Sequence, residues 1–167
     1  MVAVAVAANA LLLERPPLTA SVPSEAVLGA AVVAGLMLTA NHSWLMTATE
    51  LTRARYGLLT TPEEWARSGR SVDETPTSAA AELARNHNAH RNATENTVHF
   101  VWLATLVLMS GPPPAAALTW LVGYALARLG HTYGYLFGHD GLRGIFMSFS
   151  LVALYGLASH LVLRVWA

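Results

Sequence analysis

The stretch AHRNATEN, residues 89–96, leads directly into an apolar segment that ends at residue 109. Residues 97–109 alone are too short to cross a bilayer, which takes about 20 residues of helix. The helix is therefore expected to begin upstream, around residues 83–88, and to carry Arg91 and Glu95 with it. Ionisable residues at the edge of a membrane span are costly and usually mark a functional site.

Composition indicates a membrane protein. Of the 167 residues, 54% are hydrophobic and 12% are charged, whereas soluble domains carry about 25% charged residues. The net charge is zero and all ten basic residues are Arg, so no basic excess is present to neutralise nucleic-acid phosphates, and we expect no nucleic-acid partner. Cysteine is absent, so thiol chemistry requires a thiol brought by the substrate. The Ala-rich, Lys-free composition favours a bacterial source and hence an inner-membrane location.

Four apolar segments have the character of membrane spans, at about residues 26–49, 83–109, 115–137 and 142–166. Tight turns at residues 110–114 and 138–141 join the last three. A long polar loop follows the first span, and in it Thr61-Pro62-Glu63-Glu64 predicts a short surface helix over Trp65. The predicted fold is all-α, an integral membrane four-helix antiparallel bundle.

Arginine placement predicts the orientation in the membrane. Six arginines lie in or beside the first loop and Arg143 lies by the third, whereas the second turn has none. The positive-inside rule then puts loops one and three in the cytoplasm and both termini outside.

Residues 1–24 are expected to form a loosely structured or membrane-surface leader, and residues 25–167 a single four-span domain. The apolar run at residues 2–13 is too short to span. A cleaved signal peptide is the alternative, and the absence of a basic n-region disfavours it.

Two of the spans carry a polar stripe. At about 100° per residue, one quarter of the second span holds six such residues, namely Asn88, Arg91, Asn92, Glu95, His99 and Trp102. A narrow face of the third span holds Tyr124, Arg128, His131 and Tyr135. Since lipid-facing charges are costly, the two stripes are expected to face each other near the cytoplasmic end.

A structural interpretation of these stripes is a buried Glu95–Arg128 ion pair with Arg91 reaching the headgroups. The polar groups outnumber what one Glu can satisfy, which favours an anionic polar ligand. His87 and His90 have a spacing that occurs in metal sites, with His99 nearby, but without Cys or a clustered acid we expect no metal. His160 and Arg164 are expected at the outer interface.

Three matched segments carry a family resemblance: Ala-His-Arg-Asn-x-x-Glu-Asn at 89–96, Arg-x-x-His-Thr-x-x-Tyr-Leu at 128–136, and Arg-Gly at 143–144. Together they resemble the membrane-associated proteins in eicosanoid and glutathione metabolism (MAPEG), in the branch of the microsomal glutathione transferases and prostaglandin E synthases. The resemblance covers about residues 25–165. It implies a homotrimer of four-helix subunits with glutathione sites between subunits, open to the cytoplasm.

The resemblance also implies roles for single residues. Arg143 is the catalytic residue that faces the thiol, and Arg53 reaches in from a neighbouring subunit. The glutathione-binding set is Arg53, Arg91, Asn92, Glu95, Arg128, His131 and Tyr135. Gly144 matches the transferases, whereas the synthase has serine there, so prostaglandin isomerisation is not expected. Asn88 stands where the relatives carry Arg.

The residue types suit this chemistry. Arginines bind the carboxylates of glutathione through bidentate forks, and Glu95 suits its ammonium. A cation against the sulfur favours the nucleophilic thiolate. We therefore expect a membrane-bound glutathione S-transferase, with glutathione-dependent peroxidase activity as an accompanying expectation, acting on lipophilic electrophiles that arrive through membrane lipid. Another low-molecular-weight thiol as co-substrate, a lipid-binding scaffold of the same family, and a small transporter or proton relay are the alternatives.

Overall fold

The structure is a computed structural model that describes residues 1–12 and 20–166, and within this part of the chain every regular element is a helix. The predicted all-α class is therefore confirmed. The elements are α1 (Val2–Leu12), α2 (Glu25–Tyr56), α3 (Pro62–Ser68), η1 (Val72–Glu74), α4 (Thr77–Met109), α5 (Pro114–Ala117), η2 (Leu118–Val122), α6 (Gly123–Leu136) and α7 (Asp140–Trp166). Two of them, α2 and α7, are long and apolar enough to cross a membrane.

Helix α2 is longer than the span predicted at residues 26–49. It begins where the Ser24 hydroxyl accepts a hydrogen bond from the Val27 N–H, and it ends at Gly57, whose left-handed φ of 62° favours glycine. Its 32 residues reach about 48 Å at 1.5 Å per residue, more than the roughly 30 Å hydrocarbon core. The last turns, which carry Arg53, therefore extend beyond the apolar part of the helix.

Helix α4 begins at Thr77, which is earlier than the predicted start at residues 83–88. The extra turns pack on the extended end of α2. There Glu82 accepts a hydrogen bond from the Thr52 hydroxyl (2.9 Å), and the Asn86 side-chain amide donates to Thr52 Oγ1 (2.8 Å). The predicted start was wrong because these contacts between two helices stabilise a polar segment that has no apolar periodicity of its own.

Elements α5, η2 and α6 form one continuous helical segment, in agreement with the predicted third span. The backbone stays in the right-handed helical region at both junctions. The wider π turn of η2 lies around Trp120, which packs on α7 at Gly156. A Cβ at position 156 would lie 2.4 Å from the Trp120 ring, so this close approach requires glycine.

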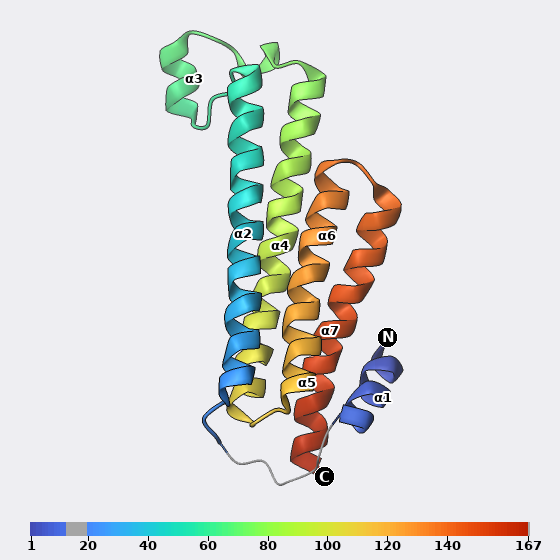
Figure 1. Ribbon diagram of the computed structural model, residues 1–167. Coiled ribbons are helices and arrows are strands. Elements are labelled where there is room, and N and C mark those ends of the chain that lie inside the picture. The colour runs from blue at the N-terminus through green and yellow to red at the C-terminus, as the bar shows by residue number, and fades with distance from the viewer. Residues whose placement is uncertain (13–19, 167) are drawn as a thin grey trace.

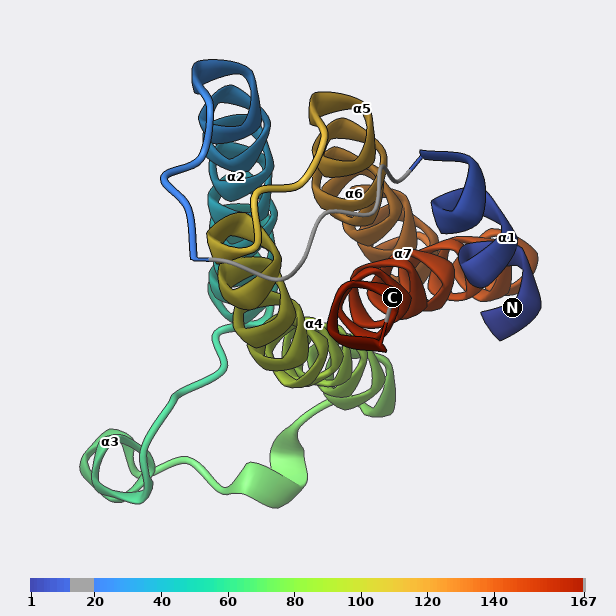
Figure 2. The ribbon, with the colours of Figure 1, turned by 90° about the horizontal axis from the view of Figure 1, so that it is seen from below.

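The long helices lie side by side (Figure 1). Figure 2 shows the helices along their axes. Helices α4 and α6 contact each other, and each of them also contacts both α2 and α7, so α4 and α6 form the centre of the packing. The main core is rich in alanine, which lets the helices approach closely. Helices α6 and α7 make the most extensive contact among the described helices, and they are joined by the turn at Gly138, whose φ is 70°.

Residues 2–12 form helix α1, in place of the loosely structured leader considered for this part of the chain, and α1 packs against α7. Asn9 is buried in that contact. Its side chain accepts a hydrogen bond from Trp120 Nε1 (2.7 Å) and donates to the Gly156 carbonyl and to Ser159 Oγ, both at 2.7 Å. Part of the predicted leader, residues 13–19, lies outside the described residues.

The polar loop contains the predicted surface helix. Thr61 caps α3, Pro62 occupies its first turn, and the Glu64 carboxylate accepts hydrogen bonds from the N–H groups of Thr60 and Thr61. Trp65 is half-buried and donates from Nε1 to the Leu59 carbonyl. This prediction is confirmed.

Candidate functional site

Arg128 is the centre of the candidate site. It lies on α6 with 0% of its surface exposed. Its Nη2 donates to Asn92 Oδ1 on α4 at 2.9 Å, and its Nη1 lies 3.8 Å from the Met147 sulfur on α7. Its Nε has no hydrogen-bond partner among the described residues. Three helices thus enclose a cation whose nearest polar partners are uncharged.

Arg143 approaches the same region from the first turns of α7. Its guanidinium carbon lies 5.0 Å from the centre of the Tyr135 ring, and its Nη2 lies 3.3 Å from Asp140 Oδ1. The Tyr135 ring in turn lies 5.6 Å from the ring of the buried His131. Arg143 therefore rests on an aromatic face, a favourable position for a guanidinium.

A glycine makes this approach of α7 to α6 possible. A Cβ at Gly134 would lie 2.7 Å from the backbone nitrogen of Arg143. Any larger residue would push the backbones apart at the point where Arg143 meets Tyr135.

Arg91 and Glu95 occupy a different face of α4. Both are exposed, and Arg91 Nη2 donates to Asn88 Oδ1 at 2.9 Å. They line a cavity of about 350 Å³ together with His87, His90 and Thr94. Within residues 1–12 and 20–166, neither Arg128 nor Glu95 takes part in an ion pair. The predicted facing of the two stripes is thus correct for Asn92 and wrong for Arg91 and Glu95, because the stripe is wider than the contact with α6.

Arg53 extends from α2 along α4 of its own chain. Its Nη1 pairs with Glu50 at 2.8 Å, and its Nη2 lies 3.4 Å from His87 Nε2. The side chain is 18% exposed. Its reach into a neighbouring subunit stays a prediction.

The predicted site residues therefore form two groups within one chain. The inner group lies between α4, α6 and α7 and consists of Asn92, Arg128, His131, Tyr135 and Arg143. The outer group consists of the exposed Arg91 and Glu95 of α4 and the half-buried Arg53 of α2, which lies along α4. Tyr135 and Arg143 lie beside the turn between α6 and α7, and Arg53 lies in the last turns of α2. Arg91, Asn92 and Glu95 lie about halfway along α4. The two groups contain four arginines, and in the described part of the chain none of them has a buried carboxylate partner, which suits an anionic ligand.

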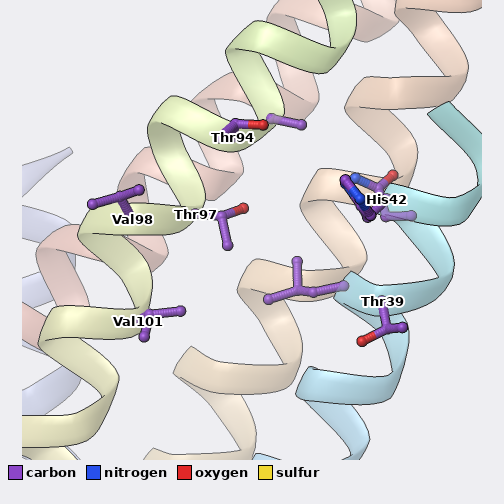
Figure 3. Close-up of a pocket in the computed structure, with 9 residues that line it drawn as sticks. Thr39, His42, Thr94, Thr97, Val98 and Val101 are labelled. Carbon is purple, nitrogen blue, oxygen red and sulfur yellow. The ribbon is translucent and has the colours of Figure 1, made fainter. Parts of the chain in front are cut away.

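A larger cavity, of about 540 Å³, lies between α2 and α4. Figure 3 shows Thr94, Thr97, Val98 and Val101 of α4 opposite Thr39 and His42 of α2. Its lining is mostly apolar, and Thr94 lines this cavity and the one beside Arg91. A lipophilic molecule in the larger cavity would therefore lie next to the outer group.

Two polar clusters were not found from the sequence. One is the pair His42 and His90, because their contact joins two helices that are far apart in the chain. The other is at the opposite end of the molecule, where Arg164 Nη2 donates to the Ser110 carbonyl (2.6 Å) and His160 Nε2 lies 3.0 Å from Ser110 Oγ. Arg164 and His160 are buried between the helices, and their position at the outer membrane interface stays a prediction. His160 and Arg164 are four residues apart on α7 and so lie on one face of the helix, and this spacing was the sequence signal that could have predicted the cluster.

The model of the MAPEG family matches residues 27–163 of the chain. That range contains both groups of the candidate site. No curated protein and no solved structure matches. Since the family model covers most of the chain, the protein belongs to the MAPEG family, a membrane family that includes glutathione transferases and related enzymes.

Proposed function

We propose that this protein is a membrane-bound glutathione S-transferase that joins the thiolate of glutathione to lipophilic electrophiles, in the transferase and prostaglandin E synthase branch of the family. One observation carries the proposal: Arg128 is fully buried and is held by the neutral Asn92 side chain. A buried cation is stable only with good partners, so an anionic ligand at this point would supply what the described residues do not. Family membership supports glutathione as that ligand.

Glutathione offers two carboxylates, one ammonium and one thiol. In the proposal the arginines bind the carboxylates, Glu95 binds the ammonium, and Asn92, His131 and Tyr135 complete the polar contacts. Because the inner and outer groups lie on different faces of one chain, the proposed binding site lies between subunits of a homotrimer. The outer group of one subunit would then complete the inner group of the next, with Arg53 contributing across the interface.

Arg143 is the proposed catalytic residue. The thiol has a reference pKa of about 8.5, and lowering it by about two units requires roughly 2.7 kcal/mol of preferential interaction with the thiolate. A guanidinium beside the sulfur provides such an interaction, and the aromatic face of Tyr135 fixes its position. The thiol proton goes to water. The thiolate sulfur then attacks the electrophilic carbon, forms a C–S bond and displaces the leaving group with its electron pair.

The proposed membrane topology has four spans formed by α2, α4, the α5–η2–α6 segment and α7. Helices α2 and α7 are each long and apolar enough to cross a membrane, and the other two spans carry Arg91, Glu95 and Arg128 of the candidate site. Since basic residues favour the cytoplasmic side, loops one and three would be cytoplasmic and both termini outside. Arg53, Tyr135 and Arg143 lie near these loops, which would give a soluble thiol access to the site. Composition favours a bacterial inner membrane.

A lipid-binding scaffold is the second candidate, and the cavity of about 540 Å³ between α2 and α4 is the observation that favours it. A scaffold has no need for a thiolate-stabilising arginine. Thiolate formation therefore separates the two functions.

The deciding experiment is an ultraviolet titration of the detergent-purified protein with glutathione. We expect thiolate absorbance that is lost in Arg143→Ala and retained in Arg67→Ala, a control in the polar loop. Turnover of halogenated aromatics and lipid hydroperoxides should follow the same pattern. A scaffold would give no thiolate in the unmodified protein, and a transporter would give thiol or proton flux in liposomes without turnover. Native mass measurement in detergent tests the trimer.

A further inference from the structure

His42 belongs to the polar stretch Asn41-His42-Ser43 that interrupts the apolar sequence of α2, and it faces His90 of α4. His42 Nδ1 and His90 Nε2 lie 3.2 Å apart. The ring centroids are 4.9 Å apart at an interplanar angle of 61°. The centroids would lie farther apart if the two nitrogens pointed straight at each other, so the two rings meet at an angle.

This geometry resembles that of two ligands on one metal ion. Zinc binds imidazole nitrogen at about 2.0–2.1 Å in tetrahedral geometry, which holds two coordinated nitrogens about 3.3–3.4 Å apart. The observed separation of the two nitrogens, 3.2 Å, is close to that range. The two histidines are on separate long helices that pack together, so their backbones need no rearrangement to bring both nitrogens to a common ion.

We propose that His42 and His90 bind one divalent transition metal ion of the zinc, nickel or copper class, for which imidazole is a favoured ligand. In the described residues no group of three or more His, Cys, Asp or Glu side chains gathers to hold a metal ion. Two coordination positions are therefore left for water or for a small ligand. His87, one turn before His90, is engaged by Arg53 and is not part of the site.

Within one chain the two histidines border two cavities. His42 is exposed and His90 is half-buried. His42 lines the larger cavity between α2 and α4, as Figure 3 shows, and His90 lines the cavity beside Arg91. An ion on the two histidines would lie at the boundary between the two cavities, with its open positions toward whatever occupies them. A simple N–H···N hydrogen bond between the rings is the competing interpretation, and metal binding tests it directly.

The test uses the full-length protein in detergent, purified without a polyhistidine tag, stripped of metal and kept free of thiols. The probes are Zn²⁺ by calorimetry and Co²⁺ by visible absorption, since tetrahedral Co²⁺ absorbs strongly. We expect one ion per chain. His42→Gln and His90→Gln should each weaken binding at least tenfold, whereas His99→Gln, an exposed control on the same helix, should leave it unchanged.

Circular dichroism and size-exclusion chromatography show whether each variant is folded. His42→Cys is a further control, because it changes the same position but keeps a metal ligand there. A cysteine at this position retains a metal ligand, so it should keep Zn²⁺ binding and give Co²⁺ a thiolate charge-transfer band. Absence of binding to the unmodified protein overturns the proposal, as does binding that persists in the double His42→Gln, His90→Gln variant. Because no glutathione is present, the result is independent of the transferase proposal.

Discussion

The side chain of Arg128 donates from Nη2 to Asn92 Oδ1 at 2.9 Å, and this bond connects α6 to α4 in the interior of the molecule. A neutral amide thus holds a fully buried cation. The amide oxygen satisfies one donor of the guanidinium without cancelling its charge, so the positive charge stays available to a ligand.

The first prediction concerns the strength of that bond. Asn92→Leu should lower protein stability, because hydrogen bonds to charged groups contribute about 1.5–3 kcal/mol and Arg128 would lose its acceptor. The double variant Asn92→Leu, Arg128→Met should lose less stability than the sum of the losses in the two single variants, because both substitutions remove the same hydrogen bond. Thermal unfolding of the two single variants and the double variant in detergent measures the coupling. Strict additivity would show that the two side chains do not interact.

The second prediction concerns the contact of α6 with α7. Gly134→Ala should reduce both thiolate formation and the unfolding temperature, because the added Cβ would lie 2.7 Å from the Arg143 backbone nitrogen. Gly144→Ala is the matched control, since nothing lies within 4 Å of a Cβ at that position. Both quantities are measured on the same preparations. An equal effect of the two substitutions would contradict a specific role of the Gly134 contact.

The third prediction concerns the charge of Arg143. Asp140 Oδ1 lies 3.3 Å from Arg143 Nη2 and offsets part of its positive charge. Asp140→Asn should therefore strengthen the interaction of Arg143 with a thiolate and shift the pH profile of thiolate formation to lower pH. The shift should be small, because the Asp140 side chain is 83% exposed and exposed pairs are weak. A shift to higher pH would argue against Arg143 as the thiolate-stabilising cation.

The fourth prediction concerns pH and the surface helix α3. Hydrogen bonds from the Thr60 and Thr61 N–H groups lower the pKa of the Glu64 carboxyl below its ordinary value of 4.5. Because the pKa is lower in the folded state, the ionised Glu64 carboxylate stabilises α3 fully above pH 4.5, and this stabilisation is lost as the pH falls through the folded-state pKa. Below the folded-state pKa of Glu64, amide hydrogens in residues 61–68 should therefore lose part of their protection, measured against the exchange rate of an unstructured peptide at the same pH. Glu64→Ala should unfold α3 at neutral pH and remove this pH dependence, because alanine has no acceptor for the Thr60 and Thr61 N–H groups. Glu63→Ala, the control, should do neither.

The fifth prediction concerns helix α1. Asn9→Ala should release α1 from α7, because it removes the acceptor of the Trp120 indole and the donors to Gly156 and Ser159. A buried polar group left without its partner costs about 1–3 kcal/mol. Limited proteolysis near the N-terminus and the tryptophan emission maximum report the change. Ala10→Ser, on the exposed face of α1, should alter neither.

Much of the helical framework follows from local sequence. The start of α3 is encoded by Thr61 and Pro62, a hydroxyl cap followed by a fixed φ. The turn before α7 was placed from the glycines of residues 138–141, of which Gly138 has a positive φ. The start of α4 was misplaced because residues 77–82 have no apolar periodicity and are helical through contacts with α2.

The sequence by itself determined which residue types are present and how they are spaced along each helix. That information was sufficient for an all-helical membrane protein and for the set of arginines and polar partners, because helical periodicity depends only on the residues of one segment. Tertiary structure alone decided that Asn92 faces Arg128 while Glu95 does not, that His42 meets His90, and that Arg164 is buried against Ser110. These relations depend on the rotation and crossing of packed helices, which are set by side chains from distant parts of the chain.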